Sequence, residues 1–207
     1  MRRGAIWLCG RGRSHPSIRF DLQYYVSAGD SKTWVAQYQP TLTTLLNVST
    51  GQKWCDVLPR PAWNGLDLEG LVAKIETDLA AIPADITPRY WLLNVGANDV
   101  DVLTTEAVTK ARWRTYFRAV HTRFSSTPIY VAKVWRRNFG ANCTTWNGWL
   151  ADVMAEPEFV AYVFAGIDET VFLENGDDGA TFTSDGIHPN AAGYVLTASA
   201  WKTAIGL

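Results

Sequence analysis

Three groups of polar residues, far apart along the chain, have the types and spacing to carry chemistry together. Asp185 precedes His188 by three residues, and His188 is one of only three histidines. A carboxylate beside an imidazole fixes the imidazole tautomer and stabilises its charged form, so this pair could act as a general base. Such a base needs a nucleophile, and Ser31 stands far upstream in a Gly-Asp-Ser sequence.

Ser31 and Asn98 both follow apolar stretches that are typical of buried strands. A serine at a strand-to-helix turn presents its hydroxyl at the carboxyl edge of the sheet, where the next helix directs unpaired amides. Asn98 could donate its side-chain N–H to a developing oxyanion. Taken singly, Ser31 could also be a helix N-cap and Asn98 a turn residue. Asp185 and His188 could equally belong to a surface turn.

The composition is that of a globular protein without a strongly charged surface. Apolar residues make up 47% of the 207 residues and charged residues 19%, which fits one domain with a sizeable core. The net charge of −1 argues against a nucleic-acid partner. No apolar run approaches the ~18 residues that indicate a membrane helix. No HExxH or similar spacing indicates a metal site.

Residues 1–20 are expected to form a tail or an added strand before a domain of residues 21–207. Four arginines surround a short apolar stretch there, which lacks the ~7–15-residue apolar core of a signal peptide. The protein is therefore expected to be cytoplasmic or a module of a larger secreted assembly. Cys9, Cys55 and Cys143 lack metal-binding spacing, and idle thiols are favoured over a Cys55–Cys143 disulfide.

Strand and helix patterns alternate along the chain, which predicts a mainly parallel sheet covered by helices on both faces. The helix after Ser31 is expected to bend or break at Pro40, because proline disfavours an interior helical position. The expected strands are residues 22–28, 54–58, 89–95, 129–134 and either 160–164 or 169–173. The expected helices are residues 32–46, 71–81, 105–124, 145–155 and 189–205.

The three polar groups, in this order and at roughly this spacing, resemble the SGNH (GDSL-type) hydrolases over about residues 22–205. The resemblance implies a flavodoxin-like three-layer α/β/α sandwich with a five-stranded parallel sheet in the order 2-1-3-4-5. It also implies that Ser31 is a nucleophile, activated by His188 and oriented through Asp185. The Ser31 N–H, a glycine N–H and the Asn98 side chain would then form the oxyanion hole.

The glycine of this oxyanion hole is less clearly marked than the other residues. The segment from Asn64 to Leu71 contains Gly65 and Gly70 but no threonine, which often follows the family's glycine. Gly70 is favoured because the helical period starts at Leu71, and Gly65 is the alternative. Lys32 follows the Gly-Asp-Ser motif in place of the family's frequent leucine, so the segment after the nucleophile is untypical.

These residues predict a serine esterase that acts on short-chain carboxylic esters, such as acetyl esters on carbohydrate, without a metal or cofactor. Trp34, Trp63 and Trp135 are candidate substrate-binding residues at the mouth of the site, where aromatic faces suit sugar rings. Core packing is the alternative for each of these three tryptophans. Two other functions stay open: a lysophospholipase or thioesterase for longer acyl chains, and a non-catalytic glycan-binding module.

Overall fold

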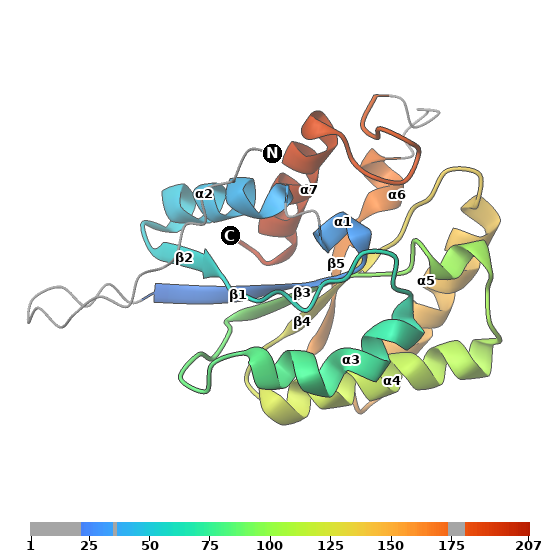
Figure 1. The fold of residues 1–207 in the computed structure, drawn as a ribbon, viewed down its shortest axis with the longest axis horizontal. Helices are drawn as coiled ribbons and strands as arrows, with labels where there is room; N and C mark the ends of the chain where they lie inside the picture. Colours follow the sequence, from blue (N-terminus) through green and yellow to red (C-terminus); the bar gives the residue numbers. More distant parts are fainter. Residues whose placement is uncertain (1–21, 35–36, 174–180) are drawn as a thin grey trace, which may run out of the picture.

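The chain forms a five-stranded parallel sheet between two layers of helices (Figure 1). The computed structural model describes residues 22–34, 37–173 and 181–207, so the expected tail of residues 1–20 lies outside the described residues. The strands are β1 (Leu22–Gly29), β2 (Lys53–Asp56), β3 (Tyr90–Asn94), β4 (Ile129–Lys133) and β5 (Val163–Asp168). Their order in the sheet is β2-β1-β3-β4-β5, which confirms the predicted topology.

The helices divide between the two faces of the sheet (Figure 1). They are α1 (Ser31–Trp34), α2 (Tyr38–Thr50), α3 (Leu68–Ala81), α4 (Glu106–Arg123), α5 (Gly140–Met154), α6 (Glu169–Phe172) and α7 (Ala191–Ala204), with a 3-10 turn η1 (Asp99–Asp101) after β3. Helices α2 and α7 pack on one face, and α3, α4 and α5 pack on the other. The crossover helices therefore cover both faces, as a parallel sheet requires.

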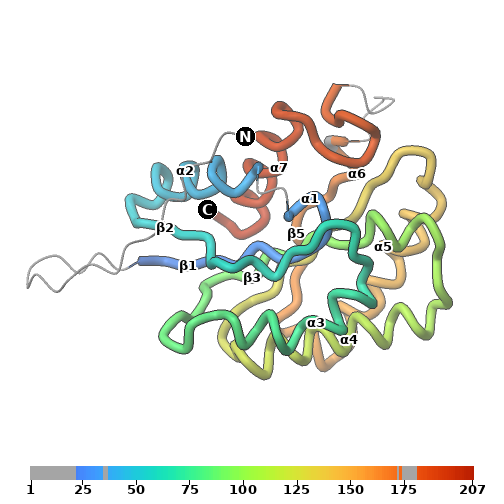
Figure 2. The backbone as a smooth tube through the Cα atoms, viewed as in Figure 1, coloured from blue at the N-terminus to red at the C-terminus, as the bar shows by residue number. Residues whose placement is uncertain are grey.

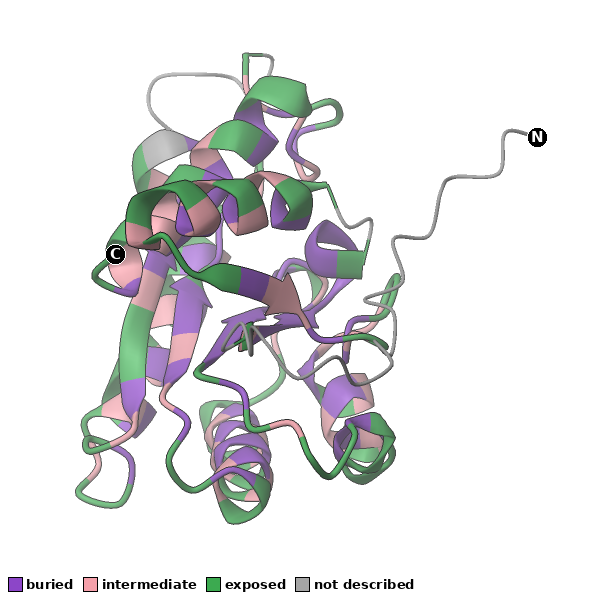
Figure 3. Cartoon of the chain, turned by 90° about the vertical axis from the view of Figure 1, so that its left-hand side faces the viewer, coloured by how far each residue is buried: buried purple, intermediate pink, exposed green. Residues whose placement is uncertain are grey.

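Two apolar cores result from this layering, one on each face of the sheet. Every residue of the central strand β3 is buried, and in Figure 3 the buried colour covers the central strands and the inner sides of the helices. Trp91 and Trp113 belong to the core under α3–α5, and Trp54 and Trp201 belong to the core under α2 and α7. Within the described ranges, no helix is long and apolar enough to cross a membrane.

The boundaries of two helices differ from the expected ones. Helix α1 ends at Trp34 and α2 begins at Tyr38, so the break precedes Pro40. Pro40 instead lies in the first turn of α2, where its missing N–H removes no intrahelical hydrogen bond. Helix α3 begins at Leu68, three residues before the expected start, because the Asp67 side chain caps it.

The fifth strand settles an alternative that the sequence left open. Strand β5 occupies residues 163–168, so the first of the two expected positions is close, and the second is wrong. Residues 169–172 form α6, because the Asp168 carboxylate accepts a hydrogen bond from the Thr170 N–H at 3.1 Å and caps this turn. No disulfide joins Cys55 on β2 to Cys143 on α5, so the alternative of a Cys55–Cys143 bridge does not hold.

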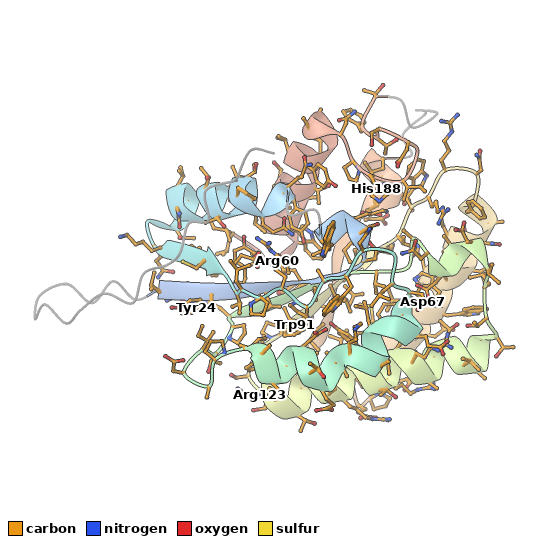
Figure 4. The ribbon with its side chains drawn as sticks, viewed as in Figure 1. Tyr24, Arg60, Asp67, Trp91, Arg123 and His188 are labelled. Atoms are coloured by element: carbon orange, nitrogen blue, oxygen red, sulfur yellow. The ribbon has the colours of Figure 1, made fainter. Side chains whose placement is uncertain are left out.

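The parallel arrangement brings the carboxyl ends of the strands to one edge of the sheet. Helix α1 follows β1 at this edge, and the segment of residues 181–190 before α7 approaches the same edge from the other end of the chain (Figure 2). Figure 4 shows His188 and Asp67 on this side of the molecule and Arg123 away from it. The polar groups that are far apart in sequence are thus collected at one edge.

Candidate active site

Ser31, His188 and Asp185 form one continuous hydrogen-bonded chain. The Ser31 Oγ lies 2.8 Å from the His188 Nε2, although 157 residues separate them in sequence. The His188 Nδ1 lies 2.7 Å from the Asp185 Oδ2 on its other side. A hydroxyl that contacts an imidazole held by a carboxylate is the geometry of a serine nucleophile with its general base. The structure thus brings together the three residues that the sequence predicts as a triad.

Asp185 uses both of its carboxylate oxygens to hold the histidine loop. Its Oδ1 accepts hydrogen bonds from the backbone N–H groups of Ile187 and His188, at 2.9 and 2.7 Å. Its Oδ2 is left for the His188 ring. Partial burial raises the pKa of Asp185, but the hydrogen bonds from the His188 backbone and ring and from Ile187 outweigh it and hold the pKa below its usual range. The carboxylate therefore stays ionised beside the imidazole.

The turn that carries Ser31 depends on a glycine and a buried aspartate. A side chain at Gly29 would place its Cβ 1.8 Å from the Asn94 carbonyl oxygen, so only glycine fits where β1 passes β3. Asp30 is fully buried and accepts the Lys32 N–H at 3.0 Å and the Ala97 N–H at 3.3 Å. Burial raises the pKa of Asp30, which the nearby Lys32 charge partly counteracts.

Asp30, and not Ser31, caps the first turn of α1. Its side chain binds the Lys32 N–H, and its carbonyl accepts the Trp34 N–H at 2.9 Å. Ser31 is the first helical residue, and its hydroxyl points to His188. The alternative in which Ser31 is only a helix N-cap therefore does not hold in this structure.

Asn98 lies four residues after the end of β3, directly before η1, and contacts the segment that precedes α3. Gly96 has the positive φ of this turn, at 129°, whereas Asn98 has an ordinary φ of −86°. The Asn98 Nδ2 donates to the Leu66 carbonyl oxygen at 2.8 Å. An amide NH₂ has two hydrogens, so a second donor stays available to a ligand. Asn98 is thus fixed by a side-chain hydrogen bond, and its backbone does not have the positive φ for which asparagine is favoured in turns.

The structure does not support Gly70 as the second oxyanion donor. Because α3 begins at Leu68, the Gly70 N–H lies inside the first turn and donates to the Asp67 Oδ1 at 2.8 Å. The amide that was expected to face the site is therefore used by the helix cap. Gly65 is the remaining glycine of the segment, and Leu66, directly after it, is the residue that Asn98 contacts.

Asp99 joins the turn after β3 to the start of α3. Both of its carboxylate oxygens lie 3.1 Å from the Leu68 N–H. Burial raises the pKa of Asp99 to about 7; its hydrogen bond from Leu68 opposes this shift, and the negative charges of Asp67 and Asp30 add to it. Nothing in the sequence marks this carboxyl group as functional beyond its place after Asn98.

Two of the three candidate tryptophans share one cavity. Trp34 and Trp63 both line a cavity of about 420 Å³ beside the nucleophile turn. Trp135 is only 4% exposed, and its backbone N–H donates to the Glu169 Oε2. The prediction that Trp135 lines the mouth of the site is corrected: its ring belongs to the packed interior.

Residues 27–196 match the model of the GDSL-like lipase/acylhydrolase family, which is most of the chain. The chain belongs to this family. The predicted class, a carboxylic ester hydrolase, is therefore confirmed at the level of the family. Among the curated proteins no match was found.

Solved structures show the same GDSL-type fold at low sequence identity. A family 3 carbohydrate esterase from Clostridium thermocellum is 17% identical, with a TM-score of 0.68 over 88% of this chain and 94% of its own. The acetylxylan esterase Axe2 from Geobacillus stearothermophilus is 16% identical, with a TM-score of 0.71 over 89% and 94%. TesA is 16% identical, with a TM-score of 0.71 over 89% and 98%.

Lys32, which departs from the family's motif, has a partner that the sequence did not reveal. Its Nζ lies 2.5 Å from the Glu169 Oε2 and 2.9 Å from the Trp135 carbonyl oxygen, and both charged side chains are essentially unexposed. The Glu169 carboxylate also accepts hydrogen bonds from the Asn94 Nδ2 at 2.9 Å and the Trp135 N–H at 3.1 Å. This buried ion pair joins α1, just after the nucleophile, to α6. The lysine in place of leucine was the one signal that could have suggested it.

Proposed function

We propose that this GDSL-type hydrolase is a serine esterase that cleaves short-chain carboxylic esters, with acetyl groups on carbohydrate as its substrate class. The observation that carries the proposal is the hydrogen-bonded chain from Ser31 through His188 to Asp185. The carbohydrate esterase and the acetylxylan esterase among the similar structures support the substrate class. The tryptophan-lined cavity beside the nucleophile turn also fits it.

The proposed reaction proceeds through an acyl-enzyme. The Ser31 Oγ attacks the ester carbonyl carbon while its proton passes to the His188 Nε2. When the tetrahedral intermediate collapses, His188 returns this proton to the leaving alcohol, and the acyl group stays on Ser31. Water then attacks the acyl carbon with His188 again as base, the bond from the acyl carbon to the Ser31 Oγ breaks, and His188 returns the proton to Ser31 as the acid leaves. Asp185 holds the His188 ring and stabilises its charged form in both halves.

Two donors are proposed for the oxyanion, and a third is reassigned. The Ser31 N–H is the first of α1 and has no acceptor within its own helix. The second hydrogen of the Asn98 amide is the side-chain donor. We assign the third donor to Gly65 in place of Gly70, because the Gly70 N–H is bonded to Asp67. Removing one such donor costs about 10²–10³ in kcat in other hydrolases.

A panel of substrates tests this proposal. The purified protein is assayed on p-nitrophenyl acetate, butyrate and octanoate and on acetylated xylotetraose, with Ser31→Ala as the control. We expect the acetate to be cleaved fastest among the three chain lengths and Ser31→Ala to be inactive. A preference for octanoate would favour a lysophospholipase or thioesterase. No turnover of any ester, together with xylotetraose binding, would favour a glycan-binding module.

A further inference from the structure

A cavity of about 420 Å³ lies beside the nucleophile turn and has no part in the chemistry described above. One wall is formed by residues 59–63, and the other by the C-terminal half of α3 together with Trp34. A volume of this size suits a ring-sized ligand. None of the three triad residues lines it.

The cavity is directly connected to the turn that carries Ser31. The Gly29 N–H donates to the Pro61 carbonyl oxygen at 3.1 Å, and the Trp63 N–H donates to the Gly29 carbonyl oxygen at 3.0 Å. Trp34 is the last residue of the four-residue helix that begins with Ser31. A ligand in the cavity would therefore lie next to the nucleophile turn on one side of the site.

Two large aromatic side chains are exposed at this cavity. Trp34 is 51% exposed and Trp63 is 37% exposed, whereas most of the large apolar side chains of the described residues are buried. The Trp63 ring is held in place, because its Nε1 donates to the Asp78 Oδ2 at 3.0 Å and the Lys74 Nζ lies 4.3 Å from the ring centroid. A fixed and exposed indole offers a flat apolar surface for a ligand ring.

The polar groups of the cavity offer hydrogen bonds but little net charge. Arg60 and Asp78 both line it. The Arg60 guanidinium is paired with Asp56, and the positive charge of Lys74 acts on the Asp78 carboxylate. Because each charge has a counter-charge, an ionic ligand gains little here. Hydroxyl groups can both donate to the carboxylate and accept from the guanidinium.

We propose that this cavity is a subsite for a neutral sugar ring of the alcohol part of the ester. The ring would contact both Trp34 and Trp63, and its hydroxyl groups would bond to Asp78 and Arg60. This inference rests on the proposed esterase function, whose substrate class it specifies. It explains why two exposed tryptophans flank the nucleophile turn while Trp135 is buried.

The subsite is tested by comparing two acetyl esters that differ only in the alcohol. Acetate release is measured from acetylated xylotetraose and from methyl acetate, whose alcohol has no ring, for the wild type, Trp34→Ala and Trp63→Ala. We expect KM for the sugar ester to rise about fivefold or more, because the stacking contact is lost. The kcat/KM for methyl acetate should stay within about twofold. Equal losses on both esters, or no loss on the sugar ester, would overturn the proposal.

Two further variants test whether the loss of affinity for the sugar ester is specific to the aromatic rings of this cavity. Trp63→Phe keeps an aromatic ring but loses the hydrogen bond to Asp78, so it should retain most of the affinity for the sugar ester. Phe164→Ala removes another exposed aromatic side chain, 38% exposed on β5 and away from this cavity, and should change neither KM. A Phe164→Ala effect as large as that of Trp63→Ala would show that the loss is not specific to the cavity.

Binding without turnover separates this inference from the proposed function. Unacetylated xylotetraose is titrated into Ser31→Ala and into Ser31→Ala/Trp63→Ala by calorimetry. If Ser31→Ala binds xylotetraose and the double variant does not, the subsite proposal is supported. If the wild type also cleaves no ester, only the esterase proposal fails. If the wild type cleaves esters but the binding of xylotetraose does not depend on Trp63, the subsite proposal fails and the esterase proposal stands.

Discussion

The distance of 2.8 Å between the Ser31 Oγ and the His188 Nε2 is that of a hydrogen bond. The nucleophile and its base thus need no rearrangement to exchange a proton. On the other side of the ring, Asp185 places one oxygen on the loop backbone and one on the ring. Three side chains from opposite ends of the chain are therefore fixed by short contacts.

Asp185→Asn should separate the orienting role of this residue from its role in folding. An amide cannot stabilise the charged imidazole, so we expect kcat to fall about 10⁴-fold while the fold is retained. Because the pKa of Asp185 lies below its usual range, its carboxylate is the ionised partner that the asparagine replaces. Steady-state kinetics on p-nitrophenyl acetate and circular dichroism measure the two effects. An unchanged kcat would show that Asp185 does not act on His188.

Gly70→Ala tests the reassignment of the oxyanion glycine. The added Cβ would meet the end of the Leu66 side chain at 2.9 Å, and the Gly70 N–H would keep its bond to Asp67. We expect kcat for a small acetyl ester to stay within about threefold of wild type, whereas Gly65→Ala should lower it more than tenfold. Steady-state kinetics of both variants on p-nitrophenyl acetate decide the point. If Gly70→Ala lowers kcat more than Gly65→Ala does, the third oxyanion donor is Gly70 and the reassignment is wrong.

At the scale of secondary-structure elements, the buried Lys32–Glu169 pair joins α1 to α6. The same carboxylate also holds Asn94 at the end of β3 and Trp135 after β4. Three strand ends and the nucleophile helix therefore meet at one glutamate. Removing one partner of such a pair leaves an uncompensated buried charge, which is far more costly than the pair is stabilising.

Lys32→Leu, which restores the residue frequent in the family, should destabilise this protein. We expect the free energy of unfolding in urea to fall by about 3–5 kcal/mol, because Glu169 stays buried without its partner. The double variant Lys32→Leu/Glu169→Gln should recover much of this loss. Lys133→Leu, which breaks the exposed pair with Asp168, is the matched control and should cost less than about 1 kcal/mol. A Lys32→Leu protein as stable as wild type would show that the pair has no such role.

The parts of the fold that depend on local patterns were predictable, and the parts that depend on long-range contacts were not. Strand β3 begins with four consecutive apolar residues, Tyr90 to Leu93, so its position was clear. The start of α3 was predicted late, because the apolar period begins at Leu71 while the cap at Asp67 sets the boundary. Because of this error, Gly70 was favoured over Gly65 as the oxyanion donor. The Lys32–Glu169 contact spans 137 residues, and no local pattern encodes it.

At the scale of the whole molecule, two buried carboxyl groups should make the stability depend on pH. Burial raises the pKa of Asp99 to about 7 and that of Asp56 to about 6. In both cases the folded protein binds its proton more tightly than the unfolded chain. Their stabilising contribution is therefore complete below about pH 4 and is lost as the pH rises toward 6 for Asp56 and 7 for Asp99.

Asp99→Asn should remove part of this pH dependence. The asparagine side chain still accepts the Leu68 N–H but carries no charge at any pH. We expect the variant to gain stability relative to wild type between pH 5 and pH 7, by up to about 1.4 kcal/mol per pH unit. Urea unfolding at pH 4, 5, 6 and 7 measures the difference. Parallel stability curves for the two proteins would show that Asp99 is not the titrating group.

The central claim is that Ser31 is the nucleophile, and labelling with a fluorophosphonate tests it most directly. This reagent is attacked by an activated serine and leaves a stable phosphonyl group on its Oγ, with loss of fluoride. Mass spectrometry of the treated wild type should show one adduct per chain, on the peptide that contains Ser31, together with loss of esterase activity. The adduct should be absent in Ser31→Ala and strongly slowed in His188→Ala. An active protein that forms no adduct, or forms it on another residue, would contradict the account.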